Sequence, residues 1–561
     1  MSISVNDPFR FFVFLLLFLA AHAAVAAPPQ AAIASAHPLA TEAGFEVLHQ
    51  GGNAFDAAVA VSAALAVVEP VGSGLGGGGF WLLYRAEDGK RVMLDGRERA
   101  PLSARRDMYL DKEGRFDSTR SINGPLSAGI PGMPAGLVHL AEQYGRLPLA
   151  QSLAPAIRYA REGFPIGERY RRLLAFRLDV VRRSPAAARV FLQQGDMPEA
   201  GFNLVQKHLA DTLERLAARG RAGFYDGEAA KMLVEGVRAA GGIWNLKDLA
   251  DYQVVERQPV EGIYRGIRIT SASPPSSGGV VLIEALNILS GYDLSALDEV
   301  TRKHLIIEAM RRAYHDRALY LGDPDFVPMP LPRLLSAYYA AGLRSTIRLD
   351  SVLRSTRLAG YVAPAKAKGE NTTHFSILDR EGNRVAATLS INLPFGSGFV
   401  PPGTGVLLND EMDDFASQHD VPNRYGLVGG DANAIAPGKR MLSSMTPTFL
   451  EDDRRVAILG TPGGSRIISM VLLAILEFAA GAGPDAWVQL PRFHHQYLPD
   501  RVQYEPGGLT DDDIAGLKKL GHRFKPVNRR YGNMQAILWE KSSGKVMAAS
   551  DPRGEGLSLV Q

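Results

Sequence analysis

Cysteine is absent from the 561-residue sequence. Its absence excludes disulfide frameworks, thiolate metal sites, cysteine nucleophiles and a lipid-modified N-terminal cysteine. Neither positive nor negative charge is in large excess, because the chain has 62 Lys and Arg residues and 59 Asp and Glu residues. No basic block of the kind that binds nucleic acid occurs, so we expect no nucleic-acid partner. The share of hydrophobic residues, 46%, and of charged residues, 22%, is typical of soluble globular proteins.

Long hydrophobic runs are scarce as well. The run at residues 11–21 follows Arg10 and is shorter than the roughly 20 residues that a membrane-spanning helix needs. Small residues come next, with Ala24 and Ala26 at the two recognition positions of a signal-peptide cleavage site. The sequence therefore predicts a signal peptide at residues 1–26, with an uncleaved membrane anchor as the alternative. We expect a bacterial protein that is periplasmic or secreted and has no membrane span after signal removal; the absence of cysteine suits that location.

The 58 glycines are abundant, and they divide the rest of the chain. Residues 40–68 read as helical with a break at residues 51–53, and residues 80–84 read as a core strand. Helices are also predicted at residues 209–219, 280–289 and 466–479, and residues 372–461 read as rich in strands. No tandem repeat is present.

A hairpin is predicted at residues 371–392. Two strands flank the turn Arg380-Glu381-Gly382, whose last residue is a glycine that can adopt a left-handed conformation. Centring the turn on Glu381 places Thr372 opposite Ser390. Because side chains alternate along a strand, Asn392 projects on the same side as Ser390. Two hydroxyls and an amide would share one face at the open end of the hairpin; the alternative is that they are ordinary strand residues.

The chain resembles the γ-glutamyltranspeptidases of the N-terminal nucleophile hydrolase superfamily. The resemblance is carried by motifs that run in the family's order through nearly the whole mature chain: 51–54, 76–79, 95–98, 372–374, 408–415, 423 with 425–433, 443–445, 462–466 and 491–496. It implies an α+β fold, a four-layer αββα sandwich with two packed sheets between helices.

The resemblance also implies self-cleavage between Asn371 and Thr372. A large subunit, residues 27–371, and a small subunit, residues 372–561, would form one intertwined domain and a heterodimer of the same precursor. The chemistry is reasonable, because a threonine hydroxyl needs a base and the freed α-amino group of the same residue can serve as one. The reference pKa of an α-amino group, about 7.7–8.0, is close to working pH.

The remaining roles follow from the same resemblance. Ser390, where the family commonly has threonine, would orient Thr372, and the backbone N–H groups of Gly463 and Gly464 would stabilise the oxyanion. The substrate's α-carboxylate and α-ammonium would be held by two groups of side chains: Arg97, Ser443 and Ser444 for the carboxylate, and Asn392, Glu411 and Asp414 for the ammonium. Tyr425 would belong to a lid within residues 417–437, a polar, glycine-rich segment expected to run over the surface. No metal and no cofactor are expected.

Several motifs have other interpretations. The glycine run at residues 72–79 contains G-x-G-x-x-G but lacks the strand-then-helix setting of a dinucleotide site. Gly463-Gly464 could bind phosphate at a helix start, although no G-K-[ST] follows. His494 and His495 are adjacent, no carboxylate completes a metal-ligand spacing, and a structural role is favoured. Taken singly, Arg97 fits a surface ion pair and Asp413-Asp414 a solvated turn.

The function that the resemblance implies is a γ-glutamyltransferase and glutathione hydrolase. It would cleave γ-glutamyl amides such as glutathione and transfer the acyl group to water or to amino-acid or dipeptide acceptors. Two alternatives remain open. One is a related self-processing acylase acting on a cephalosporin or glutaryl amide or a γ-linked polymer, and the other is a processed but inactive binding protein.

Overall fold

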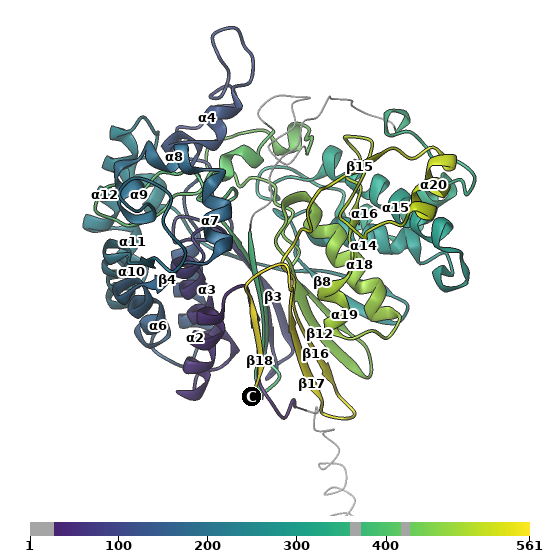
Figure 1. Cartoon of the computed structure of the whole chain (residues 1–561), viewed down its shortest axis with the longest axis horizontal. Helices are drawn as coiled ribbons and strands as arrows, with labels where there is room; N and C mark the ends of the chain where they lie inside the picture. The colour runs from purple at the N-terminus through teal and green to yellow at the C-terminus, as the bar shows by residue number, and fades with distance from the viewer. Residues whose placement is uncertain (1–26, 359–371, 417–426) are drawn as a thin grey trace, which may run out of the picture.

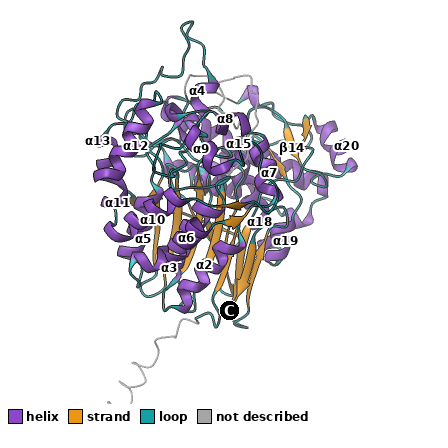
Figure 2. Ribbon diagram, turned by 60° about the vertical axis from the view of Figure 1, so that its left-hand side comes forward, coloured by secondary structure: helices purple, strands orange, loops and turns teal. Residues whose placement is uncertain are grey.

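The computed structural model describes residues 27–358, 372–416 and 427–561 (Figure 1). The predicted signal peptide, Asn371 and Tyr425 lie outside the described residues. Two β-sheets stand side by side at the centre of the molecule, with helices on both outer sides (Figures 1 and 2). In the part of the chain that is described, no helix is both long and apolar enough to cross a membrane.

The first sheet has seven antiparallel strands. Their order is β18 (Leu557–Val560), β1 (Ala32–Ser35), β9 (Thr373–Leu378), β10 (Arg384–Ser390), β2 (Gly78–Arg85), β3 (Lys90–Gly96) and β6 (Val255–Arg257). The hairpin β9–β10 lies in the middle, between β1 and β2. Strands from before and from after Thr372 therefore pair with one another within one sheet.

The second sheet has six antiparallel strands. Their order is β17 (Val546–Ser550), β16 (Gln535–Glu540), β12 (Arg455–Gly460), β11 (Thr448–Glu451), β8 (Ile267–Ser271) and β7 (Val260–Tyr264). Here too β7 and β8 come from before Thr372 and the other four strands from after it. Three short strands form a separate small sheet in the order β13 (Phe493–His494), β14 (Val502–Tyr504) and β15 (Phe524–Pro526), and β4 (Phe164–Pro165) pairs with β5 (Asn203–Leu204).

The two large sheets pack face to face through an apolar layer. Phe80 and Leu82 of β2 point into this layer and meet Phe449 and Ile458 of the second sheet. Side chains one residue along each strand point the opposite way, because the side-chain period of a strand is two. Trp81, for example, faces the helices that cover the outside of the first sheet.

Helices cover both outer faces and complete four layers, as the resemblance predicted. On the first sheet lie α2 (Pro38–His49), α3 (Ala54–Val68), α5 (Met133–Gln143), α6 (Leu149–Glu162), α7 (Glu168–Ala175), α8 (Leu178–Arg182), α9 (Pro185–Phe191), α10 (Lys207–Arg219), α11 (Ala222–Tyr225), α12 (Gly227–Ala239) and α13 (Leu246–Ala250). On the second lie α14 (Gly278–Leu289), α15 (Glu299–Tyr320), α16 (Leu331–Leu334), α17 (Ala337–Ser345), α18 (Ile467–Ala479), α19 (Pro484–Gln489) and α20 (Asp511–Leu520). The short helix α4 (Ser118–Ile122) lies at the top in Figure 1.

The predicted helices and the hairpin register are confirmed. Helix α3 begins after Asn53, whose side chain accepts hydrogen bonds from backbone N–H groups while Asp56 accepts one from the Asn53 N–H, a capping box. In the hairpin, Leu389 pairs with Thr373 and Val385 with Ile377, which is the register that puts Thr372 opposite Ser390.

Two expectations were wrong in part. Strands occur in residues 372–461 only at 373–390 and 448–460, and the described residues between them form loops and two short 3₁₀ helices, η4 (Glu411–Asp414) and η5 (Asp431–Asn433). Pro401 and Pro402 have no N–H to donate to a sheet, and Gly396 and Gly398 have positive φ. In the described part of the expected surface lid, residues 427–437, five of the eleven residues are buried, and Leu427 and Val428 pack into the core under the second helical layer.

Candidate active site

The open end of the central hairpin lies at a small cavity. Thr372 comes directly before β9 and is 4% exposed, and Ser390 ends β10 and is 2% exposed. Both line a cavity of about 20 Å³. The cavity is also lined by most of the residues that the sequence singled out: Arg97, Asn392, Glu411, Asp414, Ser443, Ser444 and Gly464. Residues separated by more than 300 positions thus meet at one point.

The glycine run has a packing role at this cavity. A Cβ at Gly77 would lie 2.1 Å from the carbonyl oxygen of Ser390, and one at Gly78 would lie 2.3 Å from that of Gly96. Both distances are far below van der Waals contact, so no other residue fits. Glycine at these positions allows β2 to lie against the end of β10. Close packing therefore explains the glycine run, and no nucleotide-binding role is needed to account for it.

Arg97 is the centre of a buried charge cluster. Its side chain is fully buried, and it donates from Nη1 to Glu411 at 2.6 Å and from Nη2 to Asp414 at 2.6 Å. Nη1 also meets Glu98 at 3.3 Å, and Nε donates to the carbonyl oxygen of Met441. The nearby carboxylates hold the pKa of Arg97 above its usual range despite burial. Arg97 is therefore paired here with Glu411 and Asp414, the two carboxylates to which the resemblance gave the opposite end of the substrate.

Glu411 is the carboxylate of this cluster that is best placed to meet a cation. Burial raises the pKa of Glu411 to about 7, although Arg97 acts in the opposite direction. Its Oε1 is buried and has no hydrogen-bond partner among the described residues. A buried acceptor without a partner is costly. An ammonium group in the cavity would supply the missing donor.

Ser443 and Ser444 also line the cavity, and Arg317 supports them. Ser443 accepts a hydrogen bond from the N–H of Ser277 through its carbonyl oxygen. Arg317, on α15, donates from Nε to the Ser277 hydroxyl at 2.9 Å and from Nη2 to the Ser444 hydroxyl at 3.4 Å. Arg317 is 4% exposed, and within the described ranges it has no carboxylate at ion-pair distance. Burial lowers its pKa to about 10.

Sequence reasoning missed Arg317. It lies on a 22-residue helix that carries several other arginines, and two of these, Arg311 and Arg312, are paired with Glu308. No sequence signal separates Arg317, which has no carboxylate partner among the described residues, from the arginines that form ion pairs, because the difference arises from the fold.

The turn with two glycines is held rigidly at the start of α18. Gly463 has φ +144° and Gly464 φ +58°, conformations that favour glycine. The next carbonyl group, that of Ser465, accepts a hydrogen bond from the Tyr314 hydroxyl, and the Ser465 hydroxyl donates to Gln496 at 2.7 Å. Gly464 lines the small cavity, whereas Gly463 lines a larger cavity next to it. The turn thus separates the two cavities and offers its backbone to both.

The histidines near the site are packing residues. Burial lowers the pKa of His374 to about 3, and its Nδ1 is 2.9 Å from the Thr388 hydroxyl. His494 is equally buried and lies between Ser469 and Gln496, so it supports the glycine turn through Gln496. The described residues contain no group of three or more His, Cys, Asp or Glu that could hold a metal ion.

The chain is similar in sequence and in fold to several known proteins. The family model described as Gamma-glutamyltranspeptidase matches residues 40–560. A "Glutathione hydrolase proenzyme" of Pseudomonas sp. (strain A14) is 44% identical over 554 residues, covering 96% of each chain, and one of Escherichia coli (strain K12) is 39% identical over 530 residues, covering 93% of this chain and 90% of the relative. The solved structure of a cephalosporin acylase from Bacillus halodurans superimposes with a TM-score of 0.82 at 29% identity and covers 100% of this chain and 99% of its own.

Proposed function

The chain belongs to the γ-glutamyltranspeptidase family, and we propose that it is a glutathione hydrolase and γ-glutamyltransferase whose nucleophile is Thr372. The observation that supports this most strongly is that Thr372, Arg97 and Asp414 line one cavity at the end of the hairpin. Arginine binds carboxylates and a carboxylate binds ammonium ions, so the cavity suits an acyl group that carries both charges.

The proposed reaction begins with autoproteolysis between Asn371 and Thr372, which frees the α-amino group of Thr372. That amine takes the proton of the threonine hydroxyl while Oγ attacks the γ-carbonyl carbon of the donor. The N–H groups of Gly463 and Gly464 stabilise the oxyanion. When the C–N bond breaks, the leaving amine takes the proton from the Thr372 ammonium, and the γ-glutamyl group remains as an ester on Oγ.

The ester is then cleaved by water or by the amine of an amino-acid or dipeptide acceptor. The attacking group gives its proton to the Thr372 amine, which returns it to Oγ as the ester C–O bond breaks. Ser390 would orient the Thr372 hydroxyl, and Tyr425 would belong to a lid that limits access of water. Neither step calls for a metal or a cofactor.

Substrate binding would separate the charges that now neutralise one another. The α-carboxylate of the donor would meet Arg97, Ser443 and Ser444, and its α-ammonium would meet Asn392, Glu411 and Asp414. Because Glu411 and Asp414 already bind Arg97, an amino-acid zwitterion, which has no net charge, would replace these ion pairs by pairs with the substrate without a net change of buried charge. A substrate with only one of the two charges would leave a partner uncompensated.

The observation that supports the acylase alternative is the similarity to the Bacillus halodurans cephalosporin acylase. The two functions differ in whether the acyl group carries an α-ammonium. We therefore expect a much higher kcat/KM for glutathione than for the matched glutaryl amide, which lacks that amine. An equal or higher kcat/KM for the glutaryl amide would favour the acylase.

We further propose that the large segment, residues 27–371, and the small segment, residues 372–561, remain together as a heterodimer. Support comes from the sheets, since each large sheet contains strands of both segments. Export to the periplasm or the exterior is proposed from the sequence of residues 1–26.

A further inference from the structure

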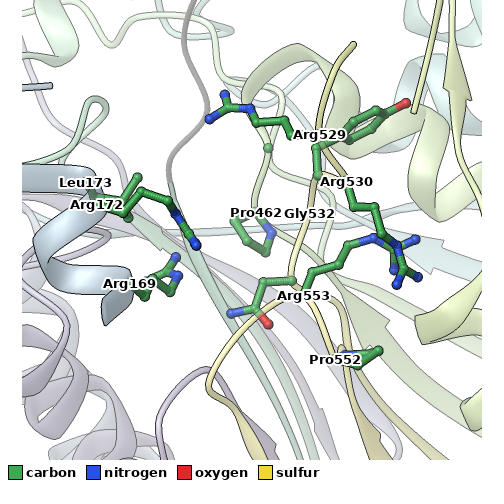
Figure 3. A pocket seen from close by; sticks show the side chains of 12 residues that line it. Arg169, Arg172, Leu173, Pro462, Arg529, Arg530, Gly532, Pro552 and Arg553 are labelled. Carbon is green, nitrogen blue, oxygen red and sulfur yellow. The ribbon is translucent and has the colours of Figure 1, made fainter. Parts of the chain in front are cut away.

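The larger cavity beside the glycine turn is cationic and measures about 360 Å³. Figure 3 shows the five arginines that line it: Arg169, Arg172, Arg529, Arg530 and Arg553. Because Gly463 also lines this cavity, it belongs to the candidate active site. A second cationic cavity shares no lining residue with it or with the small cavity, and the proposed function gives it no role.

This second cavity, which we call the α9–α10 cavity, has a volume of about 310 Å³. Sites for small molecules have volumes of about 300–1,000 Å³, so it can hold one. It is lined by α9, by the start of α10 and by the loop at residues 400–405, and Figure 1 shows both helices in the layer that covers the first sheet. The helices precede Thr372 in the sequence and the loop follows it. Both segments of the chain therefore build the walls.

Hydrogen bonds hold the loop against both helices. The Thr212 hydroxyl of α10 donates to the carbonyl oxygen of Thr404 at 2.7 Å. The N–H of Val400 donates to the hydroxyl of Ser184, the residue before α9, at 3.4 Å. Gly405 has φ +66°, and a Cβ there would lie 2.2 Å from a backbone nitrogen in the first turn of α10. The loop thus lies directly on α10, and the cavity is formed before any ligand binds.

Part of the cavity wall is aliphatic. The side chains of this part are Ala186, Val190, Val205, Leu209 and Val400. Three of them, Ala186, Val190 and Val205, are only half-buried in the described structure. An apolar group in the cavity would remove their surface from water, which is favourable.

Basic side chains line the same cavity. Arg189 and Lys207 are exposed, and neither has a carboxylate at ion-pair distance among the residues that the structure describes. His208, the third basic residue, has a carboxylate oxygen of Asp211 at 3.6 Å. No Asp or Glu is among the lining residues. An excess of positive charge therefore lies beside an apolar wall, and it would attract an anion.

We propose that the α9–α10 cavity binds a small amphiphilic carboxylate, that is, a short aliphatic chain that ends in one carboxylate. The chain would cover the aliphatic wall, and the carboxylate would meet Arg189 and Lys207. The planar guanidinium group of Arg189 can donate to both carboxylate oxygens at once. A neutral apolar molecule would leave the two cations without a partner, and a small anion without a chain would leave the aliphatic wall in water. The inference does not rest on the proposed function, because none of the proposed catalytic residues lines this cavity.

Such a ligand would also stabilise the assembled protein. Its site contains residues from before and after Thr372, so it would bind the folded chain and not the separated, unfolded segments. A ligand that binds only the folded form raises Tm once its concentration exceeds Kd.

The test is calorimetric titration of the purified protein with octanoate, hexanoate, octanamide and acetate, with Tm measured beside it. Octanoate should bind about tenfold more tightly than hexanoate, because two more methylene groups are buried. It should also bind about tenfold more tightly than octanamide, which has the same chain without the charge. Acetate should bind most weakly, and the rise in Tm should follow the same order.

Variants then locate the site. Arg189→Gln and Lys207→Gln should each raise Kd for octanoate about threefold, and the double variant about tenfold, without a change for octanamide. Two controls, Arg238→Gln on the exposed face of α12 and Arg530→Gln in the active-site cavity, should match the unaltered protein. Hydrolysis of glutathione should be the same in the double variant as in the unaltered protein.

Several results would overturn the proposal. Equal affinities for octanoate and octanamide would show that the charges do not contribute, and equal affinities for octanoate and acetate would show that the aliphatic wall does not. Unchanged binding of octanoate in the double variant would exclude the α9–α10 cavity, and so would a loss in Arg530→Gln as large as in the double variant. Because Arg189 and Lys207 are exposed, their variants should keep the Tm of the unaltered protein in the absence of ligand.

Discussion

Arg97 donates from Nη2 to Asp414 Oδ2 at 2.6 Å, and this bond joins the residue after β3 to the 3₁₀ helix η4. The two residues come from opposite sides of Thr372 in the sequence. Neither segment alone contains both, so the charge cluster exists only in the assembled fold. Under the proposed function, stability and substrate binding would therefore depend on the same buried ion pairs.

Replacement of Arg97 by methionine should destabilise the protein. Glu98, Glu411 and Asp414 would lose their shared cation, and breaking a buried pair from one side costs about 3–5 kcal/mol. Urea denaturation at neutral pH should show this loss, and the loss should shrink at acid pH, where the carboxylates take up protons. The control is Arg105→Met, which removes the ion-pair partner of Asp107. The side chains of Arg105 and Asp107 are 75% and 69% exposed, so this change should cost less than about 1 kcal/mol of stability. Equal stabilities of the two variants would contradict the role of the cluster.

The pKa of Glu411 gives a pH dependence with a definite sign. Folding raises this pKa to about 7, so the folded state holds the proton more tightly than the unfolded chain does. The contribution to stability is complete at pH values below the ordinary carboxyl range and is lost as the pH rises through about 7. Glu411→Gln removes this titration, and its Tm should depend less on pH near neutrality than that of the unaltered protein.

The control for this measurement is Glu235→Gln, on the exposed face of α12. Its Tm should follow the unaltered protein at every pH. Parallel Tm curves for Glu411→Gln and Glu235→Gln would be inconsistent with a raised pKa at Glu411.

Arg317 is expected to act on substrate binding rather than on stability. It is a buried cation that binds two hydroxyls and, within the described part of the chain, no carboxylate. Arg317→Met should therefore leave Tm unchanged or raise it, because a buried charge without an ionic partner is removed. KM for a γ-glutamyl donor should rise severalfold, since Ser444 loses a donor that positions it, and kcat should change less. Arg317→Lys should restore part of the affinity; a lower Tm with unchanged KM would show a purely structural role.

The sequence supported the hairpin well, because its register depends on local turn chemistry. Gly382 has φ +90° in the turn, as expected, and the side-chain period then determines which residues share a face. The loops at residues 391–416 and 427–447 were predicted less well, since their apolar residues are buried by tertiary packing and not by pairing in a sheet. Leu427 is an example: in a polar, glycine-rich segment it is nonetheless buried and lines the cavity.

The site residues also divide into those that the sequence predicted and those that it did not. Arg97, Glu411 and Asp414 belong to recognisable motifs, and the structure brings them together. Arg317 and the five arginines beside Gly463 belong to none. Their role depends on which of these arginines form ion pairs with carboxylates. Contacts between distant segments, such as that of Glu69 with Arg169, determine which arginines do so.

Ser390 should affect the rate of processing. Its hydroxyl accepts the N–H of Asn392 at 2.7 Å, and it lies opposite Thr372 in the hairpin register. Ser390→Ala should slow the appearance of the small chain on a denaturing gel and reduce turnover, with little change in Tm. Ser390→Thr keeps the hydroxyl and should process at a rate close to that of the unaltered protein. Unimpaired processing of the alanine variant would exclude Ser390 from the proposed reaction.

The most direct test of the central claim is the mass of the purified protein under denaturing conditions. If Thr372 is the nucleophile, two chains should appear, and the smaller should begin with Thr372 and end with Gln561. Thr372→Ala should give a single uncleaved chain and no hydrolysis of glutathione, and Thr372→Ser should be cleaved slowly. A single chain from the active, unaltered protein, or normal cleavage of Thr372→Ala, would contradict the account.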